Sequence, residues 1–455
     1  MSKLYNISNI PKSIAPKIAK DLLVEPKKDF GFQQSYFVKA EGVEAFAMYD
    51  NCPIDIMEGV WVALPFSYGY HNLSIMKEDN VEQISYLIPE FPKCEMKFVG
   101  ELLERQREIR EESIEILNRT KSLVLSLHTG FGKTIFALYL ASRIKKKILV
   151  LCHRKVIIEQ WIQSGKKYLK NITIDEFGNK KKGSIKEPDM LVANVLNIAK
   201  YPPHTFTSYG LVIIDEIHTI CTTQFSRALT RIFPQYIIGL SATPHRTDGM
   251  DKIIELYCGP EMIIRKLWRQ FNVYIVRTGF IPEVTYQQNG TLDWNSYLES
   301  QSKDNDRNNL IVKLIRFFSN RTILVLVKRR EHAEILYNKL YKIDHVDTFY
   351  GNDLNPNYNS RILIATTSKG GVGFDHPGLD MLITAADVEE NYLQYVGRVF
   401  RKDTTIPIIL DLVDELKTGM KHASTRSKVC KEIGGTVRQF HTIFPDFNIY
   451  TTFIN

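Results

Sequence analysis

From residue 96 onward the chain consists of short runs rich in Ile, Val and Leu that alternate with longer amphipathic stretches. Apolar runs of this length, separated by helical stretches, are typical of buried parallel strands in an α/β sheet. The runs form two series, at 122–127, 147–152, 211–215 and 236–240, and then at 322–327, 361–366, 380–384 and 406–411. The pattern therefore predicts two α/β lobes, which we expect to join within residues 250–310, where the sequence is polar and irregular.

The length of the chain also predicts more than one domain. A single compact domain rarely reaches 455 residues, because one hydrophobic core stops growing well below that size. Residues 1–95 are rich in Pro, Tyr and Phe and carry no motif that assigns them a role. We therefore expect an N-terminal accessory domain at 1–95, a first lobe at 96–265 and a second lobe at 266–455.

Composition and charge exclude several classes of protein. Hydrophobic residues make up 44% and charged residues 24%, which is typical of a folded globular chain. No apolar run approaches the ~20 residues that span a bilayer, and the start has no apolar core of a secretory signal. None of the six cysteines forms a Cys-x-x-Cys pair, so neither a zinc ribbon nor a disulfide framework is expected. We expect a soluble, intracellular protein, whose net charge of +8 permits a nucleic-acid partner without requiring one.

The most specific motif is HTGFGKT, which lies between a predicted strand and a predicted helix. This is the context of a phosphate-binding loop, in which backbone N–H groups surround the phosphates at a helix N-terminus. Lys133 would reach the β- and γ-phosphates, and the hydroxyl of Thr134 would bind Mg²⁺. The other loop residues expected at the nucleotide are Thr129, Gly130, Phe131 and Gly132. Leu127 stands where the full GxxxxGK[ST] pattern has its first glycine, so a turn that merely ends a strand is the simpler alternative.

An apolar strand that ends in two acids supplies the second motif. The segment LVIIDEIH places Asp215 and Glu216 at a predicted strand end. Asp215 would hold Mg²⁺ through water, and Glu216 would polarise the attacking water as general base. A pair of solvated acids is the alternative, but the order of the two motifs favours a nucleotide site. Together they predict a protein that hydrolyses ATP or GTP.

Two further segments distinguish among nucleotide-hydrolysing proteins. GLSATPHR follows another apolar strand, and QYVGRVFR contains Gln394, Gly397, Arg398 and Arg401. The spacing predicts that the two arginines lie one helical turn apart, on one helix face. On spacing alone, we would expect such a face to make surface ion pairs.

Taken in order, TGFGKT, DEIH, SAT and QxxGRxxR resemble the motifs of superfamily 2 helicases and translocases of the DExH type. The resemblance implies an α/β fold with two tandem RecA-like lobes that close on ATP and Mg²⁺, preceded here by a smaller N-terminal domain. It implies that Lys133 and Glu216 act in hydrolysis from the first lobe. Gln394, Arg398 and Arg401 would act from the second lobe, with the arginines as fingers on the γ-phosphate.

The resemblance also assigns residues between these motifs. Arg105 and Gln106 stand in the segment that reads the adenine in this family. Gly373 and Asp375 belong to the segment that links nucleic acid to nucleotide. The family often has Pro where this chain has His153. Nucleic-acid contacts would come from Lys155, Asn194, Arg246 and Thr366.

Two segments narrow the resemblance. Arg246 and Asp248 are similar to the RxD segment of XPB-like and viral transcription helicases, and residues 409–435 resemble the C-terminal strand and basic helix of helicases from large cytoplasmic DNA viruses. We therefore interpret the sequence as an ATP-dependent DNA helicase or translocase that serves transcription or repair, with transcription or repair proteins as further partners. A viral protein of this kind would act in the host cytoplasm or the virion.

Three alternatives remain open. The first is an RNA helicase, because DExH motors act on either polymer and nothing in the sequence reads a 2′-hydroxyl. The second is an ATP-switched adaptor that binds duplex without unwinding it, against which the intact Lys133, Glu216, Arg398 and Arg401 argue. The third is the motor part of a restriction complex, for which no nuclease motif is convincingly placed.

Overall fold

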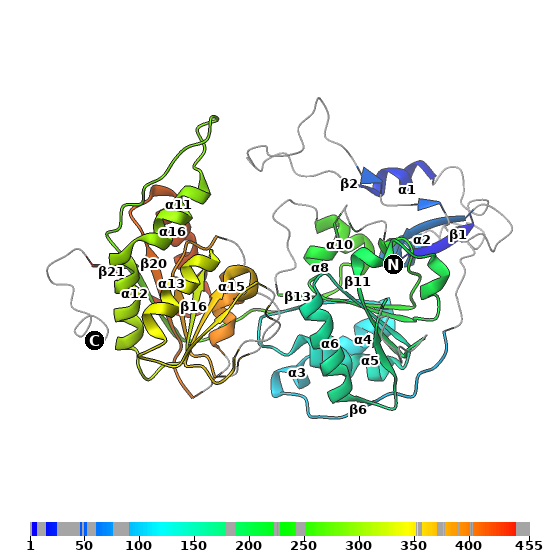
Figure 1. Ribbon diagram of the computed structural model, residues 1–455. Coiled ribbons are helices and arrows are strands. Elements are labelled where there is room, and N and C mark those ends of the chain that lie inside the picture. The colour runs from blue at the N-terminus through cyan, green and yellow to red at the C-terminus, as the bar shows by residue number, and fades with distance from the viewer. Residues whose placement is uncertain are drawn as a thin grey trace. The chain divides into compact units, whose positions relative to one another are not determined.

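The computed structural model divides the chain into two compact units, Met1–Arg265 and Lys266–Asn455, and each is described by itself (Figure 1). The described residues are 2–6, 15–24, 46–47, 50–51, 61–75, 91–178, 187–222, 225, 228–242, 251–351, 353, 357–370, 376, 378–389, 392–400, 402 and 404–442. Within these ranges, no helix has both the length and the apolar character needed to cross a membrane.

The first unit is centred on a seven-stranded parallel sheet in the order β10-β11-β8-β12-β13-β7-β14. Its strands are β7 (Ser122–Leu127), β8 (Ile148–Cys152), β10 (Ile174–Glu176), β11 (Met190–Asn194), β12 (Leu211–Ile214), β13 (Tyr236–Ser241) and β14 (Met262–Arg265). Every residue of β7, β8 and β12 is buried. These runs are apolar without alternation because helices cover both faces of a parallel sheet.

The helices of the first unit are connected to the strands of the sheet, and several of them follow the carboxyl end of a strand. They are α3 (Glu104–Glu108), α4 (Arg110–Thr120), α5 (Lys133–Ile144), α6 (Lys155–Tyr168), α7 (Val195–Ile198), α8 (Ile217–Ile220), α10 (Asp251–Cys258) and the 3₁₀ helix η3 (Pro203–Phe206). α5 begins after Gly132, and α6 begins after Arg154, which is extended. Parallel strands followed by helices direct the helix N-termini to one edge of the sheet, where α/β proteins bind ligands.

The described N-terminal residues pack on the core of the first unit. Their elements, with the short β6–β9 ladder, are β1 (Ser2–Asn6), α1 (Ala15–Asp21), β2 (Leu23–Val24), β3 (Phe46–Ala47), β4 (Asp50–Asn51), β5 (Trp61–Pro65), α2 (Phe66–Ile75), β6 (Lys97–Phe98) and β9 (Leu169–Lys170). Leu64 and Phe66 lie in one hydrophobic cluster with Tyr257 of α10. The assignment of residues 1–95 as an accessory domain stays a prediction.

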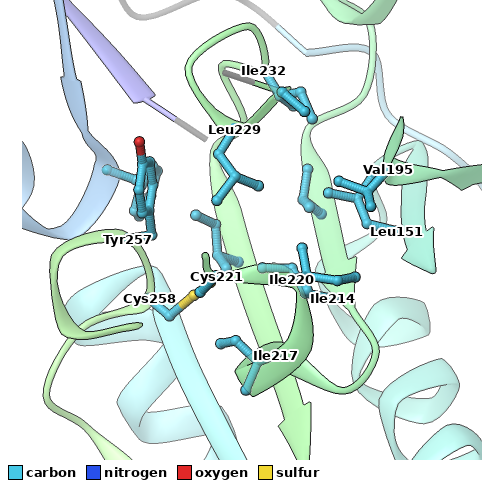
Figure 2. Packing of buried hydrophobic residues seen from close by; sticks show 14 of the residues in the cluster. Leu151, Val195, Ile214, Ile217, Ile220, Cys221, Leu229, Ile232, Tyr257 and Cys258 are labelled. Carbon is cyan, nitrogen blue, oxygen red and sulfur yellow. The ribbon is translucent and has the colours of Figure 1, made fainter. Parts of the chain in front are cut away.

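The segment after β12 is anchored in the same core (Figure 2). Ile217 and Ile220 of α8 are fully buried, and Figure 2 shows them in one cluster with Ile214 and Cys258. A Cβ at Gly239 of β13 would collide with Cδ1 of Ile217, so the glycine lets α8 lie directly against β13. The two acids between β12 and α8 therefore have well-packed elements on both sides.

The second unit is also centred on a seven-stranded parallel sheet, in the order β17-β18-β16-β19-β20-β15-β21. Its strands are β15 (Phe271–Arg277), β16 (Ile323–Val327), β17 (Val346–Phe349), β18 (Ile362–Thr366), β19 (Met381–Thr384), β20 (Ile408–Val413) and β21 (Gly435–His441). Its helices are α11 (Trp294–Lys303), α12 (Asn305–Phe317), α13 (Arg330–Leu340), α14 (Thr367–Gly370), α15 (Tyr392–Val396), the 3₁₀ helix η4 (Gly397–Val399) and α16 (Lys417–Glu432). Two parallel sheets flanked by helices confirm the predicted fold class.

The sequence predicted that the polar segment 287–309 would be irregular. The structure shows that this was wrong for most of the segment. It forms α11 and the start of α12 inside the second unit. Each helix begins at an aspartate cap: Asp293 accepts from the N–H of Asn295, and Asp304 accepts from that of Arg307. Such caps satisfy N–H groups that a helix start leaves unpaired.

Candidate nucleotide-binding site

The loop between β7 and α5 turns sharply at two glycines. Gly130 and Gly132 have φ values of 87° and 90°, a conformation that favours glycine. The N–H of Phe131 donates to the carbonyl of His128 at 3.2 Å. α5 then begins at Lys133, so the loop leads into a helix N-terminus, where free N–H groups and the helix dipole attract phosphate. This geometry fits a phosphate-binding loop.

Two side chains of α3 bind the carbonyl groups of this loop. Nε2 of Gln106 donates to the carbonyl oxygens of Phe131 at 3.1 Å and Gly132 at 3.2 Å, while its Oε1 accepts from a backbone N–H of the preceding turn at 2.9 Å. Arg105 donates to the carbonyl of Gly130 at 2.7 Å. The Gln106 side chain is buried. The structure therefore places both residues as braces of the loop, and their predicted contact with adenine stays a prediction.

Asp215 follows β12, and hydrogen bonds reach both of its carboxylate oxygens. Oδ1 accepts from the N–H of Glu216 at 3.0 Å, and Oδ2 accepts from the indole N–H of Trp161 at 2.8 Å. Burial, and then the Glu216 carboxylate, raise the pKa of Asp215 to about 6, against the effects of Trp161 and Lys133. The Lys133 ammonium donates to the carbonyl of Leu127 at 3.1 Å. The charges of Lys133 and Asp215, from two separate motifs, are thus close enough to interact.

Glu216 has an unusual backbone conformation for its residue type. Its φ of 51° and ψ of 60° are left-handed, which costs a non-glycine residue ~1–3 kcal/mol and is often found at functional sites. Its buried Oε2 accepts no hydrogen bond from the described part of the chain and lies 3.6 Å from Nδ1 of His218. The same nitrogen of His218 is 2.9 Å from the hydroxyl of Ser241. The DEIH and SAT segments are therefore connected directly through His218.

The residues at this position fit a hydrated magnesium ion. Thr134 is half-buried in the first turn of α5. Asp215 is close enough to interact with the charge of Lys133, the residue before Thr134. Mg²⁺ keeps several waters and is commonly held by one or two carboxylates together with phosphate oxygens. The raised pKa of Asp215 marks a carboxylate that nearby positive charge would stabilise.

The segments after β8 and β11 meet at Asn194. Its Oδ1 accepts from the N–H of Leu196 at 3.0 Å, which caps α7, and its Nδ2 donates to the carbonyl of His153 at 3.4 Å. Asn194 thus has a structural task in joining two strand ends. Lys155 is the exposed first residue of α6. Nucleic-acid contact by either residue stays a prediction.

His153 occupies the position that often holds Pro in the family. Its Nδ1 is buried and has no hydrogen-bond partner among the described residues. Burial, and then the charges of Arg154 and His218, lower the pKa of His153 to about 4. The ring is therefore neutral near pH 7.

Gln394 and Arg398, two of the residues predicted to act from the second unit, do not lie in one α-helix. Gln394 is buried on α15, which ends before Arg398, and Arg398 lies in the 3₁₀ turn η4. Val399 and Phe400 lie in one hydrophobic cluster with Tyr395 of α15. Arg401 lies outside the described residues, so the common helix face of the two arginines stays a prediction.

Several predicted residues lie outside the described residues, namely Arg246, Asp248, Gly373, Asp375 and Arg401. Thr366 is described: it is the buried last residue of β18, and its hydroxyl is 3.1 Å from that of Ser368. It stands at the carboxyl edge of the second sheet.

Arg426 of α16 anchors the segment that leads to α15. Its buried guanidinium donates to Asp411 at 2.8 and 3.0 Å, to Asp387 at 2.7 Å and to the carbonyl of Val388 at 2.6 Å. Nδ1 of His422 lies 2.5 Å from Asp387. Because each of these buried charges is paired and hydrogen-bonded, the network can hold the segment without an uncompensated charge.

Two contacts at the site were not predicted from the sequence. Trp161 belongs to an apolar face of α6 with Ile157 and Ile158, which indicates core packing alone. The available signal was that a buried indole N–H usually needs an acceptor. The bond between His218 and Ser241 joins motifs that the sequence presents separately.

Comparison with known proteins agrees with this geometry. Residues 99–246 match the family described as type III restriction enzyme, res subunit. A relative from Invertebrate iridescent virus 6, which carries the name of a helicase, is 39% identical over 376 residues, or 77% of this chain and 85% of the relative. A relative from Acanthamoeba polyphaga mimivirus, which carries the name of an ATP-dependent RNA helicase, is 26% identical over 96% of this chain and 85% of its own length.

Solved structures show the same fold. Dbp5 of S. cerevisiae, bound to RNA and ADP BeF3, aligns with a TM-score of 0.54 at 14% identity, over 74% of this chain and 89% of Dbp5. The site, the fold and the viral relatives together define a helicase. The chain belongs to the superfamily 2 helicases, in the group found in large DNA viruses. Helicases of this family use ATP and act on nucleic acid.

Proposed function

We propose that this helicase couples the hydrolysis of ATP to movement on DNA and to the unwinding of duplex. The observation that supports this most strongly is the convergence of Lys133, Asp215 and Glu216 near the N-terminus of α5. They offer a cation for phosphates, a carboxylate for a metal ion and a second carboxylate with an oxygen free of hydrogen bonds from the described residues. These are the three elements that hydrolysis of a nucleoside triphosphate requires.

Each residue of the first unit would have a separate task. Lys133 would neutralise charge on the β- and γ-phosphates. Mg²⁺, held by Thr134 and through water by Asp215, would add positive charge at the phosphate oxygens. Glu216 would orient the attacking water and accept its proton. A movement of the Glu216 side chain would be transmitted through His218 to Ser241, and from there to the segment that follows β13.

The second unit would complete the hydrolysis reaction. Arg398 and Arg401 would stabilise the negative charge that develops on the transferring phosphoryl group. Gln394, which is buried on α15, would support this segment. Closing of the two units on ATP, and their opening after hydrolysis, would move the protein along one strand.

Phosphate contacts would dominate nucleic-acid binding, with Lys155 as one contact. Such binding is largely independent of sequence and weakens steeply with salt. Lys155→Ala should therefore weaken binding about equally on all sequences and reduce the salt slope by about 1. Lys166→Ala, an exposed lysine near the other end of α6, is the matched control. A strong sequence preference with a flat salt response would contradict the proposal.

RNA is the second candidate substrate. The name of the mimivirus relative favours it, while the likeness to viral transcription helicases favours DNA and a role in transcription or repair. The experiment is an ATPase assay with single- and double-stranded DNA and RNA, followed by strand displacement on 3′- and 5′-tailed duplexes. Stronger stimulation and displacement with DNA would support the proposal. Stronger stimulation by RNA would mean that RNA, and not DNA, is the substrate. Duplex binding without turnover would indicate an adaptor.

A further inference from the structure

The indole of Trp161 connects the helix that begins at Lys155 with the carboxylate of Asp215. Trp161 lies on α6 and is 1% exposed. Its N–H donates to Oδ2 of Asp215 at 2.8 Å. Most buried tryptophans contribute packing, but here the polar edge of the ring meets an acid that stands at the nucleotide site.

The hydrogen bonds at Asp215 fix the orientation of its carboxylate. Oδ1 accepts from the backbone N–H of Glu216, and Oδ2 accepts from Trp161. The first bond comes from the adjacent peptide and moves with Asp215 itself. The second comes from a different element, α6. Of these two hydrogen bonds, the one from Trp161 can therefore transmit a displacement of α6 to the carboxylate.

α6 is packed closely enough to transmit small movements. Ile157, Ile158 and Trp161 are all buried on one face of the helix. A Cβ at Gly165 would lie 2.9 Å from Ile174 and 3.0 Å from Met190, so the helix approaches β10 and β11 tightly. Close-packed interiors transmit strain, and an N–H···O hydrogen bond normally spans only about 2.7–3.2 Å.

We propose that Trp161 is a positioning residue that sets the Asp215 carboxylate for Mg²⁺ and makes hydrolysis respond to nucleic acid bound at the start of α6. The proposal rests on the proposed function, because it takes Asp215 as the metal-binding acid and Lys155 as a nucleic-acid contact. A phosphate at Lys155 would fix the position of α6. The indole N–H would then hold Asp215 in the orientation that hydrolysis requires.

The test replaces the indole N–H without changing the shape of the ring. β-(Benzothien-3-yl)alanine, which has sulfur in place of the N–H, is introduced at position 161, and Trp161→Phe is made as a second variant. Trp294→Phe, a partly exposed tryptophan of α11 in the second unit, is the control. The readouts are the kcat and KM for ATP with and without DNA or RNA, the Mg²⁺ concentration for half-maximal rate, and the melting temperature.

For the isosteric variant we expect an unchanged melting temperature and a KM within about threefold of wild type. The nucleic-acid-stimulated kcat should fall about tenfold and the Mg²⁺ requirement should rise several-fold, as expected when one hydrogen bond to a charged group is lost. A stimulated kcat and Mg²⁺ dependence equal to those of wild type would overturn the proposal. A lower kcat together with a higher KM and a lower melting temperature would also overturn it, because such parallel changes would indicate packing alone.

A double-mutant cycle with Lys155→Ala tests the connection along the helix. If nucleic acid acts through Trp161, Lys155→Ala should reduce stimulation in wild type but have little further effect in the isosteric variant. Additive effects, which are normal for uncoupled sites, would contradict this. Failure of this inference can be distinguished from failure of the proposed function: in the first case wild type is stimulated by nucleic acid and the variant equals it, whereas in the second wild type itself shows no stimulation.

Discussion

The amide nitrogen of Gln106 lies 3.2 Å from the carbonyl oxygen of Gly132. A Cβ added to Gly132 would come within 2.5 Å of the same nitrogen. A side chain from α3 thus fills the space next to the last residue of the loop before α5. The amide also donates to the carbonyl of Phe131. The position of the loop depends on a residue that the sequence assigned to recognition of adenine.

Replacement of Gln106 by Ala separates these two roles. If Gln106 braces the loop, affinities for ATP and GTP should fall together by about tenfold, because two carbonyl groups lose their partner. If Gln106 reads adenine, only the preference for ATP over GTP should fall. The measurement is the KM for each nucleotide. Arg107→Ala, an exposed residue of the same helix, is the control and should change neither.

Lys133→Ala should weaken both binding and turnover. The ammonium is the side-chain cation that the first turn of α5 offers to the phosphates, so its loss affects the ground state and the transition state alike. Nucleotide affinity and steady-state hydrolysis should both decrease. Arg143→Ala, in the last turn of the same helix, is the control for a lost positive charge and should behave as wild type.

Arg398→Ala and Arg401→Ala should affect turnover far more than binding. Their charge is needed when negative charge develops on the phosphoryl group, and an arginine finger is typically worth ~10³–10⁵ in rate. We expect ATP affinity within about tenfold of wild type and almost no nucleic-acid-stimulated hydrolysis. Lysine at either position should rescue only in part, because it lacks the planar fork of donors. Near-normal hydrolysis in both alanine variants would show that they are surface residues.

His332 predicts a dependence of stability on pH. It is buried on α13 and its Nε2 donates to Oδ1 of Asn308 at 2.9 Å. Burial, and then the charge of Arg307, lower the pKa of His332 to about 3. Between pH 3 and the unfolded pKa of ~6.5, the unfolded state binds more protons. Above pH 6.5 the neutral His332 therefore costs no stability. As pH falls from 6.5 towards 3, the free energy of unfolding decreases by ~1.4 kcal/mol per pH unit.

The matched variant is His332→Gln, whose amide can still donate to Asn308 but does not titrate. Urea unfolding at pH 7.5 and pH 5 measures the free energy of unfolding. Wild type should lose about 2 kcal/mol more than the variant over this interval. An equal loss in both proteins would mean that His332 does not stay neutral in the folded state.

The strands that could be predicted are those buried on both faces. β7, β8 and β12 read as largely apolar runs, with Ser122 and Ser126 of β7 as exceptions, because every residue is buried. β10, β14, β17 and β21 are edge strands with many half-buried or exposed residues, so polar side chains interrupt their pattern. The start of α11 was hidden for a different reason: Asp293 reads as a loop residue, although in the structure it caps a helix.

The candidate site shows the same limit. The motifs HTGFGKT and DEIH predict Lys133 and Asp215 as site residues, because such motifs follow directly from the chemistry of phosphate and magnesium. The sequence could not show that Gln106 meets Gly132, or that Trp161 meets Asp215. Both contacts join segments far apart in the chain, and each depends on the exact packing of a helix against the sheet.

Glu216→Gln tests the central claim most directly. The amide keeps the shape of the side chain at its left-handed position but cannot accept a proton from water. The measurement is steady-state ATP hydrolysis with saturating DNA, alongside equilibrium binding of ATP. We predict that ATP and Mg²⁺ binding are retained and that turnover falls by ~10²–10⁴, which traps the protein with ATP bound. Turnover equal to that of wild type would contradict the assignment of Glu216 as general base and with it the hydrolytic site described above.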